Sequence, residues 1–170
     1  MHILIADKFE EQGLTELRDR EFEVTFEPGT TAETLPEMIR NHQPDVLVVR
    51  STKVTRDAIE AGDSLALVVR AGAGYNTIDI ASASANGVFV ANCPGKNAVA
   101  VAELTWGLIL SCDRRIPDQT EELRAGTWNK KEYSRASGLA GRTIGVIGMG
   151  KIGQAVVERA RAFGMNVAAW

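Results

Sequence analysis

The sequence predicts an α/β fold in which two parallel-sheet units follow one another along the chain. Two observations lead to this fold class. Through residues 2–91, short apolar runs alternate with helical patterns, which is typical of a parallel sheet covered by helices. Near residue 148, an apolar run leads into a glycine-rich turn, and a helical pattern begins directly behind it. With 45% apolar and 24% charged residues, the chain also has the composition of an ordinary globular protein.

Five strands and four helices are predicted in the first unit. Strands are predicted where apolar, often β-branched, residues run without interruption, and helices where apolar residues recur every three or four positions. The predicted strands are 2–6, 22–26, 45–49, 65–69 and 88–91, and the predicted helices are 10–19, 32–41, 56–61 and 80–85. This alternation predicts a flavodoxin-like, doubly wound domain.

An almost wholly apolar helix is predicted over residues 97–112, with Asn97 as its N-cap. Because the helix is apolar on all sides, we expect it to be buried on all sides, either between two domains or in a subunit contact. Glu103 is a carboxylate inside this helix and needs hydrogen-bond donors. We interpret it as a structural carboxylate that ties down neighbouring backbone, in preference to a catalytic acid.

A second, shorter helix follows the apolar one. Pro117 is expected to open it and Gly126 to end it, and residues 128–137 are predicted to be a surface connection. A Pro-Gly pair before the apolar helix places the domain boundary, so that the predicted domains are 1–95 and 96–170.

The glycine-rich turn has the spacing Gly148-x-Gly150-x-x-Gly153 and follows a predicted strand at 143–147. In such a turn the first glycine allows a tight bend, the second lets the backbone approach a diphosphate, and the third lets the helix pack closely on the strand. The helix N-terminus then points free N–H groups at the anion. The sequence therefore predicts a dinucleotide-binding Rossmann unit, and the alternative is a turn whose glycines serve only packing.

The residues after the turn support the dinucleotide interpretation. A helical pattern begins at Ile152, Gly164 stands where a C-terminal cap is expected, and residues 166–170 are predicted to be the next strand. A nucleoside-triphosphate P-loop is excluded because Lys151 is followed by isoleucine and not by Ser or Thr. A Rossmann domain also needs a ribose-binding acid about 20 positions after the glycines, and further strands for the second half of the dinucleotide. We therefore expect the chain to be the front part of a longer enzyme.

A candidate site for a small anion lies at the carboxyl ends of two predicted strands, where parallel sheets bind ligands. Arg50 directly follows one predicted strand and Arg70 directly follows the next, and a planar guanidinium suits carboxylates and phosphates. Gly72, Ala73 and Gly74 follow at once, and their backbone N–H groups can form an anion-binding concavity. The alternative is that each arginine only pairs with a surface acid.

Charge and composition exclude several other classes of function. The net charge is −3, and acidic and basic residues are interspersed, so we expect neither nucleic acid nor a membrane surface as a partner. No signal peptide or membrane span is recognisable, so a cytoplasmic location is expected. Cys93 and Cys112 lack metal-ligand spacing and are interpreted as reduced structural thiols. His2 and His42 are interpreted as structural or surface residues, and no residue of the chain is a convincing catalytic base.

Taken in order, the motifs resemble those of the NAD-dependent D-isomer-specific 2-hydroxyacid dehydrogenases, and the resemblance covers the whole chain. They are Val69-Arg70-Ala71-Gly72-Ala73-Gly74, Ile78-Asp79, Asn86-Gly87-Val88, Val90-Ala91-Asn92, Asn97, Val101-Ala102-Glu103, Leu139-Ala140-Gly141-Arg142-Thr143 and Gly148-Met149-Gly150-Lys151-Ile152-Gly153. The chain departs from the pattern at Asn76-Thr77, where the family often has Asp-Asn.

The resemblance implies a flavodoxin-like substrate domain followed by the first part of a Rossmann NAD-binding domain. Arg50 and Arg70 would contact the substrate, and the backbone at Gly72, Ala73 and Gly74 would cradle its carboxylate. The residues implied to lie against NAD are Ala73, Gly148, Gly150, Lys151, Ile152 and Gly153. The family's catalytic arginine, glutamate and histidine, like its ribose-binding aspartate, are expected after Trp170, so no catalytic residue and no metal site is assigned within the chain.

The implied function is NAD-dependent oxidation of a D-2-hydroxy acid, with 3-phosphoglycerate as the expected substrate and 3-phosphohydroxypyruvate as the product, on the route to serine. One alternative is a glyoxylate or hydroxypyruvate reductase. Another is a dinucleotide-sensing interaction protein, like the C-terminal binding protein corepressors, which an exposed apolar groove on the first domain would favour. The expected partners are a small anionic substrate and a second copy of the chain, joined through the NAD domain. Residues 1–170 alone are expected to be inactive.

Overall fold

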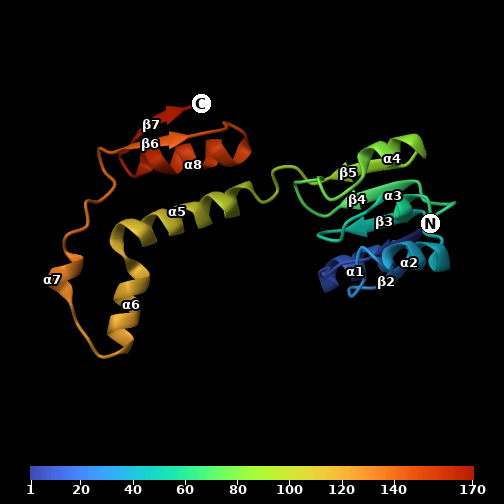
Figure 1. Cartoon of the computed structure of the whole chain (residues 1–170), viewed down its shortest axis with the longest axis horizontal. Coiled ribbons are helices and arrows are strands. Elements are labelled where there is room, and N and C mark those ends of the chain that lie inside the picture. Colours follow the sequence, from blue (N-terminus) through green and yellow to red (C-terminus); the bar gives the residue numbers. More distant parts are fainter. The chain divides into compact units, whose positions relative to one another are not determined.

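The computed structural model describes residues 1–170, which fold into two compact units, Met1–Lys96 and Asn97–Trp170 (Figure 1). The division lies one residue from the domain boundary predicted above. Each unit is built on its own parallel sheet and is described by itself.

The first unit is a five-stranded sheet with the strand order β2-β1-β3-β4-β5, in which all neighbours are parallel. The strands are β1 (His2–Ile5), β2 (Glu23–Phe26), β3 (Val46–Val49), β4 (Leu67–Arg70) and β5 (Phe89–Asn92), and the helices are α1 (Glu11–Asp19), α2 (Leu35–His42), α3 (Arg56–Ile59) and α4 (Ile80–Ala85). This is the flavodoxin-like order, so the predicted fold class is confirmed.

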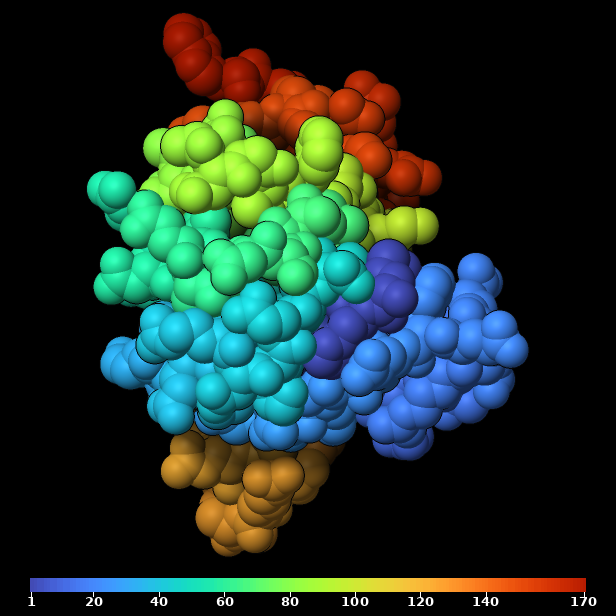
Figure 2. All heavy atoms as spheres, turned by 90° about the vertical axis from the view of Figure 1, so that its right-hand side faces the viewer, coloured from blue at the N-terminus to red at the C-terminus, as the bar shows by residue number.

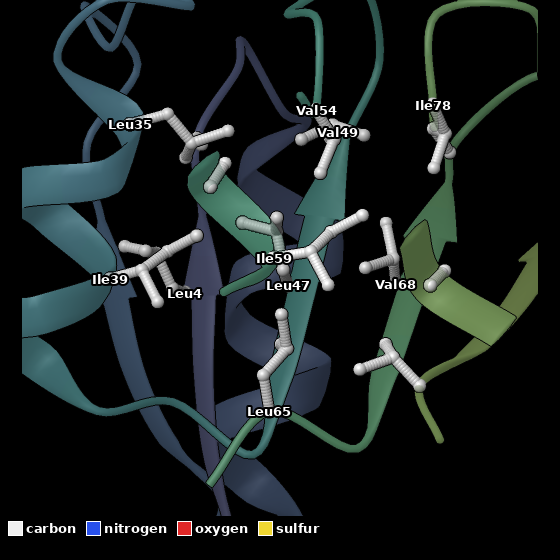
Figure 3. Packing of buried hydrophobic residues seen from close by; sticks show 14 residues of the cluster. Leu4, Leu35, Ile39, Leu47, Val49, Val54, Ile59, Leu65, Val68 and Ile78 are labelled. Carbon is white, nitrogen blue, oxygen red and sulfur yellow. The ribbon is translucent and has the colours of Figure 1, made fainter. Parts of the chain in front are cut away.

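Both faces of this sheet are packed, which is why the strands are apolar without alternation. On one face, Leu4, Leu47 and Val68 pack beneath α2, α3 and α4 (Figure 3). On the other, Ile5 and Val48 pack against α1. In Figure 2 the N-terminal strand, in dark blue, accordingly lies between α1 in blue and the α2 segment in cyan. The helices thus hold the strands so that all five carboxyl ends meet at one edge.

The second unit contains one strand–helix–strand motif and three further helices. Its elements are α5 (Ala98–Arg114), α6 (Ile116–Arg124), α7 (Lys130–Tyr133), β6 (Thr143–Val146), α8 (Lys151–Ala162) and β7 (Asn166–Ala169). β6 and β7 pair in parallel. Trp106 of α5 is buried, donates from Nε1 to the carbonyl oxygen of Val156 at 3.2 Å, and stacks on Phe163 with 4.8 Å between ring centroids. α5 and α8 are therefore joined by both packing and a hydrogen bond.

Within the second unit the apolar helix is not buried on all sides, so its expected burial between two domains or in a subunit contact stays a prediction. Ala102 and Trp106 of α5 are buried, but Val99, Leu104 and Leu108 are 55%, 65% and 59% exposed. α8 covers only one side of α5, and nothing else in the second unit covers the other. None of the helices has the length and the apolar character needed to cross a membrane.

Glu103 also differs from its interpretation as a buried structural carboxylate. Its side chain is 63% exposed and pairs with the Arg159 guanidinium of α8, with 3.3 Å between Nη2 and Oε1. It contacts a side chain of the neighbouring helix instead of local backbone, because it lies at the margin of the α5–α8 contact. The pair belongs to the class of exposed ion pairs that contribute little to stability.

Three smaller expectations can be compared with the structure. Asn97 is the N-cap of α5, but its side chain makes no capping hydrogen bond. Gly126 after α6 and Gly164 after α8 have positive φ angles of 80° and 68°, as expected for residues that end helices. The predicted connection 128–137 contains the one-turn helix α7, which is held by the ion pair between Arg115 and Glu132 at 3.0 Å.

Candidate functional site

The structure brings the two predicted arginines to the same edge of the first sheet. β3 and β4 are neighbours, and Val49 is in register with Arg70, the last residue of β4. Arg50 is the residue directly after β3, so both arginines stand at adjacent strand ends. Neither forms an ion pair with an acid of the chain. The alternative interpretation, in which each arginine serves a surface acid, is therefore not what the structure shows.

The loop after β4 is fixed by its carbonyl groups. The Gly72 carbonyl accepts the Cys93 N–H at 2.9 Å, and the Ala73 carbonyl accepts the Asn92 Nδ2 amide at 2.7 Å. By contrast, the N–H groups of Ala73 and Gly74 donate no hydrogen bond within the chain. A rigid loop that keeps two successive N–H groups available has the makings of an anion-binding concavity.

Gly72 leaves free the space that the Arg70 side chain occupies. A Cβ atom at residue 72 would run into the Arg70 guanidinium, which lies against the glycine backbone. The Arg70 Nε atom is buried and has no hydrogen-bond partner in the chain. Buried N–H donors without an acceptor are uncommon and call for an explanation, and a bound anion would supply the missing acceptor.

A carboxylate that sequence reasoning missed organises the loop after β3. The Asp7 Oδ2 atom accepts the backbone N–H groups of Arg50, Ser51 and Thr52 at 2.7, 3.0 and 3.0 Å, and Oδ1 accepts the Ser51 hydroxyl at 2.8 Å. Partial burial by itself raises the pKa of the Asp7 carboxyl, but the hydrogen bonds from these three residues outweigh it and lower that pKa from 3.8 to about 2. The available signal was an acid directly after the first strand, at the edge where ligands bind.

The loops after β3 and β4 are also tied to each other. Val54 and Ile78 form an isolated parallel bridge, in which the Val54 N–H donates to Thr77 and the Asp79 N–H donates to Val54, both at 2.9 Å. The Asp79 carboxylate then caps α4 by accepting the Ser82 N–H at 2.9 Å. The Arg50 loop and the glycine loop are therefore parts of one connected edge.

In the second unit, each glycine of the turn has the geometry that its predicted role requires. Gly148 has a φ angle of +93°, and its N–H donates to the Trp170 carbonyl at 2.8 Å. Gly150 is the N-cap of α8, and a Cβ there would meet nothing within 4 Å. Gly153 is buried, and a Cβ there would collide with the carbonyl oxygen of Gly148. The turn is thus tight at its base and open at its mouth.

The mouth of this turn is accessible to a ligand. Met149 and Ile152 are each 40% exposed, and Lys151 and Ile152 are the first two residues of the 12-residue helix α8. The positive end of the helix macrodipole lies at this point. A diphosphate fits these residues on two observations, the empty space at Gly150 and the closely packed Gly153 that places the helix start beside the strand end.

The histidine side chains lie away from both sites, and Cys93 contributes to the first site only through the backbone N–H that holds Gly72. His2 lies at the amino edge of the first sheet, where its Nε2 atom lies 2.8 Å from the Thr25 hydroxyl and its ring packs edge-on against His42. Cys93 and Cys112 are both free thiols.

A groove of about 530 Å³ runs along β5 and α4 of the first unit. Among its lining residues, Tyr75, Ile80 and Phe89 are 57%, 41% and 76% exposed. This is the kind of apolar groove that the interaction-protein alternative requires.

Comparison with known proteins places these two sites in context. A family model described as the catalytic domain of D-isomer-specific 2-hydroxyacid dehydrogenases matches residues 3–168. The D-3-phosphoglycerate dehydrogenase of Methanocaldococcus jannaschii is 45% identical over 166 residues, which cover 97% of this chain and 31% of the relative. The hydroxypyruvate reductase of Thermotoga maritima is 45% identical over 158 residues, which cover 91% of this chain and 49% of the relative.

Solved structures agree with the sequence relatives. The NAD+-bound 3-phosphoglycerate dehydrogenase of Entamoeba histolytica matches with a TM-score of 0.79 at 29% identity, over 100% of this chain and 53% of that one. The chain thus spans about a third to a half of the length of the relatives it matches.

Proposed function

Because the chain belongs to the D-isomer-specific 2-hydroxyacid dehydrogenase family, we propose that it supplies the substrate-binding edge and part of the NAD site of an enzyme that oxidises 3-phosphoglycerate. In the overall reaction the C2 hydroxyl group becomes a ketone, NAD+ is reduced to NADH, and one proton is released. The observation that carries the proposal is the pair Arg50 and Arg70, which stand at adjacent strand ends without an acidic partner.

The edge of the first sheet suits a substrate with an anionic group at each end. The N–H groups of Ala73 and Gly74 are available for the substrate carboxylate, and the Arg70 guanidinium lies against Gly72, the residue directly before them. Arg50, on the neighbouring strand end, would take a second anionic group such as a phosphate. Charge-assisted hydrogen bonds of this kind are about twice as strong as neutral ones.

In the second unit, Gly148, Gly150 and Gly153 would hold the diphosphate of NAD, with the start of α8 directed at it. When bound, NAD+ supplies the hydride acceptor. The residues of this chain bind and orient the anions, and no residue among them is assigned to take the hydroxyl proton.

A second candidate function is the reduction of hydroxypyruvate or glyoxylate, because the Thermotoga maritima hydroxypyruvate reductase is as similar to this chain as the phosphoglycerate dehydrogenase is. The two candidates differ in the phosphate group of the substrate. The interaction-protein alternative is supported by the groove along β5, but the relatives reported above carry the names of enzymes.

The test uses the full natural polypeptide and compares its activity on different substrates. We expect kcat/KM to be higher for the phosphorylated pair, 3-phosphoglycerate and 3-phosphohydroxypyruvate, than for hydroxypyruvate and glyoxylate. Arg50→Ala should raise KM for the phosphorylated substrate by about tenfold, equivalent to about 1.4 kcal/mol, and leave that for hydroxypyruvate within about twofold. Preferential turnover of hydroxypyruvate by the wild type would instead support the second candidate. The interaction-protein alternative would be supported if the wild type turned over none of these acids and bound a peptide in the β5 groove.

A further inference from the structure

We propose that Asp7 is a positioning residue of the substrate site: its carboxylate holds the backbone of residues 50–52 in the path that presents Arg50 to an anionic substrate. The inference rests on the proposed function, in that Arg50 is taken to bind the substrate, and it concerns a residue in the loop after a different strand, β1.

The contacts of the Asp7 carboxylate define the course of the loop residue by residue. One oxygen accepts three consecutive N–H groups, from Arg50, Ser51 and Thr52, at 2.7 to 3.0 Å. The other oxygen accepts the Ser51 hydroxyl at 2.8 Å. Because three successive peptide units must point at one atom, the backbone of this segment has little freedom while the carboxylate is in place.

Arg50 depends on this backbone because nothing else in the chain holds its side chain. The residue is exposed, and its guanidinium makes no ion pair and no hydrogen bond. A flexible cation on a flexible loop would lose conformational entropy on binding an anion, whereas a cation on a fixed loop loses less. The Asp7 contacts therefore act on substrate affinity.

Joining the strands does not require these contacts. β1 and β3 are already paired over three residue positions, and the Ala6 N–H donates to the Val48 carbonyl at 3.0 Å. At the opposite end of the same two strands, the Asp45 carboxylate accepts the His2 N–H at 2.7 Å. Asp45 thus makes the same kind of bond between β1 and β3, but at the amino edge of the sheet, away from Arg50 and Arg70. It is therefore a matched control.

The experiment uses the full natural polypeptide and compares Asp7→Ala, Asp7→Asn and Asp45→Ala with the wild type. Steady-state kinetics give KM for 3-phosphoglycerate and for NAD+, and hydrogen–deuterium exchange reports the protection of the amides of residues 50–52. We expect Asp7→Ala to raise KM for 3-phosphoglycerate by about tenfold and to speed exchange at these amides, with KM for NAD+ within about twofold of the wild type. Asp45→Ala should leave both KM values within about twofold of the wild type, even if it lowers the melting temperature as much as Asp7→Ala does.

Asp7→Asn is the conservative variant, and it keeps the test decisive if Asp7→Ala does not fold. Its carbonyl oxygen can still accept the three amides and its NH2 group can donate to the Ser51 hydroxyl, but the bonds are no longer charge-assisted. We expect KM for 3-phosphoglycerate to rise by only about threefold, between the wild type and the alanine variant. A merely structural role would affect stability without this graded and substrate-specific change.

The inference is overturned if Asp7→Ala leaves KM for 3-phosphoglycerate or the exchange of residues 50–52 unchanged, or if Asp45→Ala raises this KM equally. If the wild type turns over none of the acids, the proposed function fails, and the affinity for inorganic phosphate measured by calorimetry decides the inference. Weaker phosphate binding by Asp7→Ala than by Asp45→Ala would then support the positioning role. Equal affinities, or no phosphate binding by the wild type, would overturn it.

Discussion

The three glycines of the turn in the second unit have different structural roles, so an alanine substitution should have a different effect at each. At Gly153 an added methyl group would collide with the Gly148 carbonyl oxygen and would lie 3.2 Å from the carbonyl carbon and 3.5 Å from Cγ1 of Val146. These are backbone atoms and a core side chain, so the start of α8 must move. Overpacking of this kind costs about 1–3 kcal/mol.

The movement cannot be absorbed locally, because α8 carries Val156 and Ala160, which pack in the core of the second unit with Trp106. We therefore expect Gly153→Ala to lower the free energy of unfolding by about 2 kcal/mol, or the melting temperature by about 4–8 °C for a chain of this size. Urea denaturation of the NAD-free protein measures this loss.

Gly150→Ala should behave in the opposite way. The φ and ψ angles of Gly150 are −70° and −171°, which any residue adopts, and its Cβ would meet nothing within 4 Å. Stability should therefore be unchanged or rise by up to about 1 kcal/mol. NAD affinity should fall by about tenfold or more, because the methyl group would occupy the space in which a diphosphate approaches the backbone.

Gly148→Ala should lower both the free energy of unfolding, as Gly153→Ala does, and the affinity for NAD, as Gly150→Ala does. The φ angle of +93° strains any residue with a side chain, at about 1–3 kcal/mol. A wild-type urea midpoint for Gly153→Ala, or wild-type NAD affinity for Gly150→Ala, would contradict the roles given to these glycines.

Three further predictions concern stability and assembly. The lowered pKa of Asp7 stabilises the fold above its unfolded value of 3.8, and this contribution is lost as the pH falls through the folded value of about 2. Because the carboxyl is partly solvated, this contribution amounts to about 1 kcal/mol. Asp7→Asn should therefore reduce the fall in the free energy of unfolding between about pH 4 and 2, and an unchanged fall would contradict this. Trp106→Ala removes a buried ring and its bond to Val156, and should cost about 3–5 kcal/mol in urea unfolding, while a loss below about 1 kcal/mol would show that α5 and α8 are held otherwise. We also propose that the exposed face of α5 joins two copies of the full polypeptide, so Leu104→Glu with Leu108→Glu should shift a dimer to a monomer in sedimentation, and a dimer that persists would place the interface elsewhere.

Local patterns account for most of what could be predicted from the sequence. Each strand of the first sheet is a short apolar run, and each turn glycine stands at a fixed spacing from the strand before it, so both can be recognised within about ten residues. The position of Arg50 beside Arg70 also followed, because the carboxyl ends of parallel strands share one edge.

What could not be predicted depends on residues that are distant in sequence. Asp7 bonds to amides 43 to 45 positions away, and an acid after a strand has no pattern that distinguishes such a clamp from an ordinary surface carboxylate. The exposure of Leu104 was missed for a related reason. An apolar pattern shows that a face can be buried, but it does not show whether the covering surface belongs to the same unit.

The exposed face of α5 and the Asp7 contacts bear differently on function. The apolar face of α5 affects assembly, and its role can be tested without reference to the chemistry. The Asp7 contacts lie at the edge that we propose to bind an anion, where a carboxylate is unexpected because its negative charge would repel an anionic substrate. Its charge is directed at three backbone amides, and the Arg50 guanidinium makes no ion pair with it. The acid therefore organises the edge while leaving the positive charge of the arginine available to the ligand.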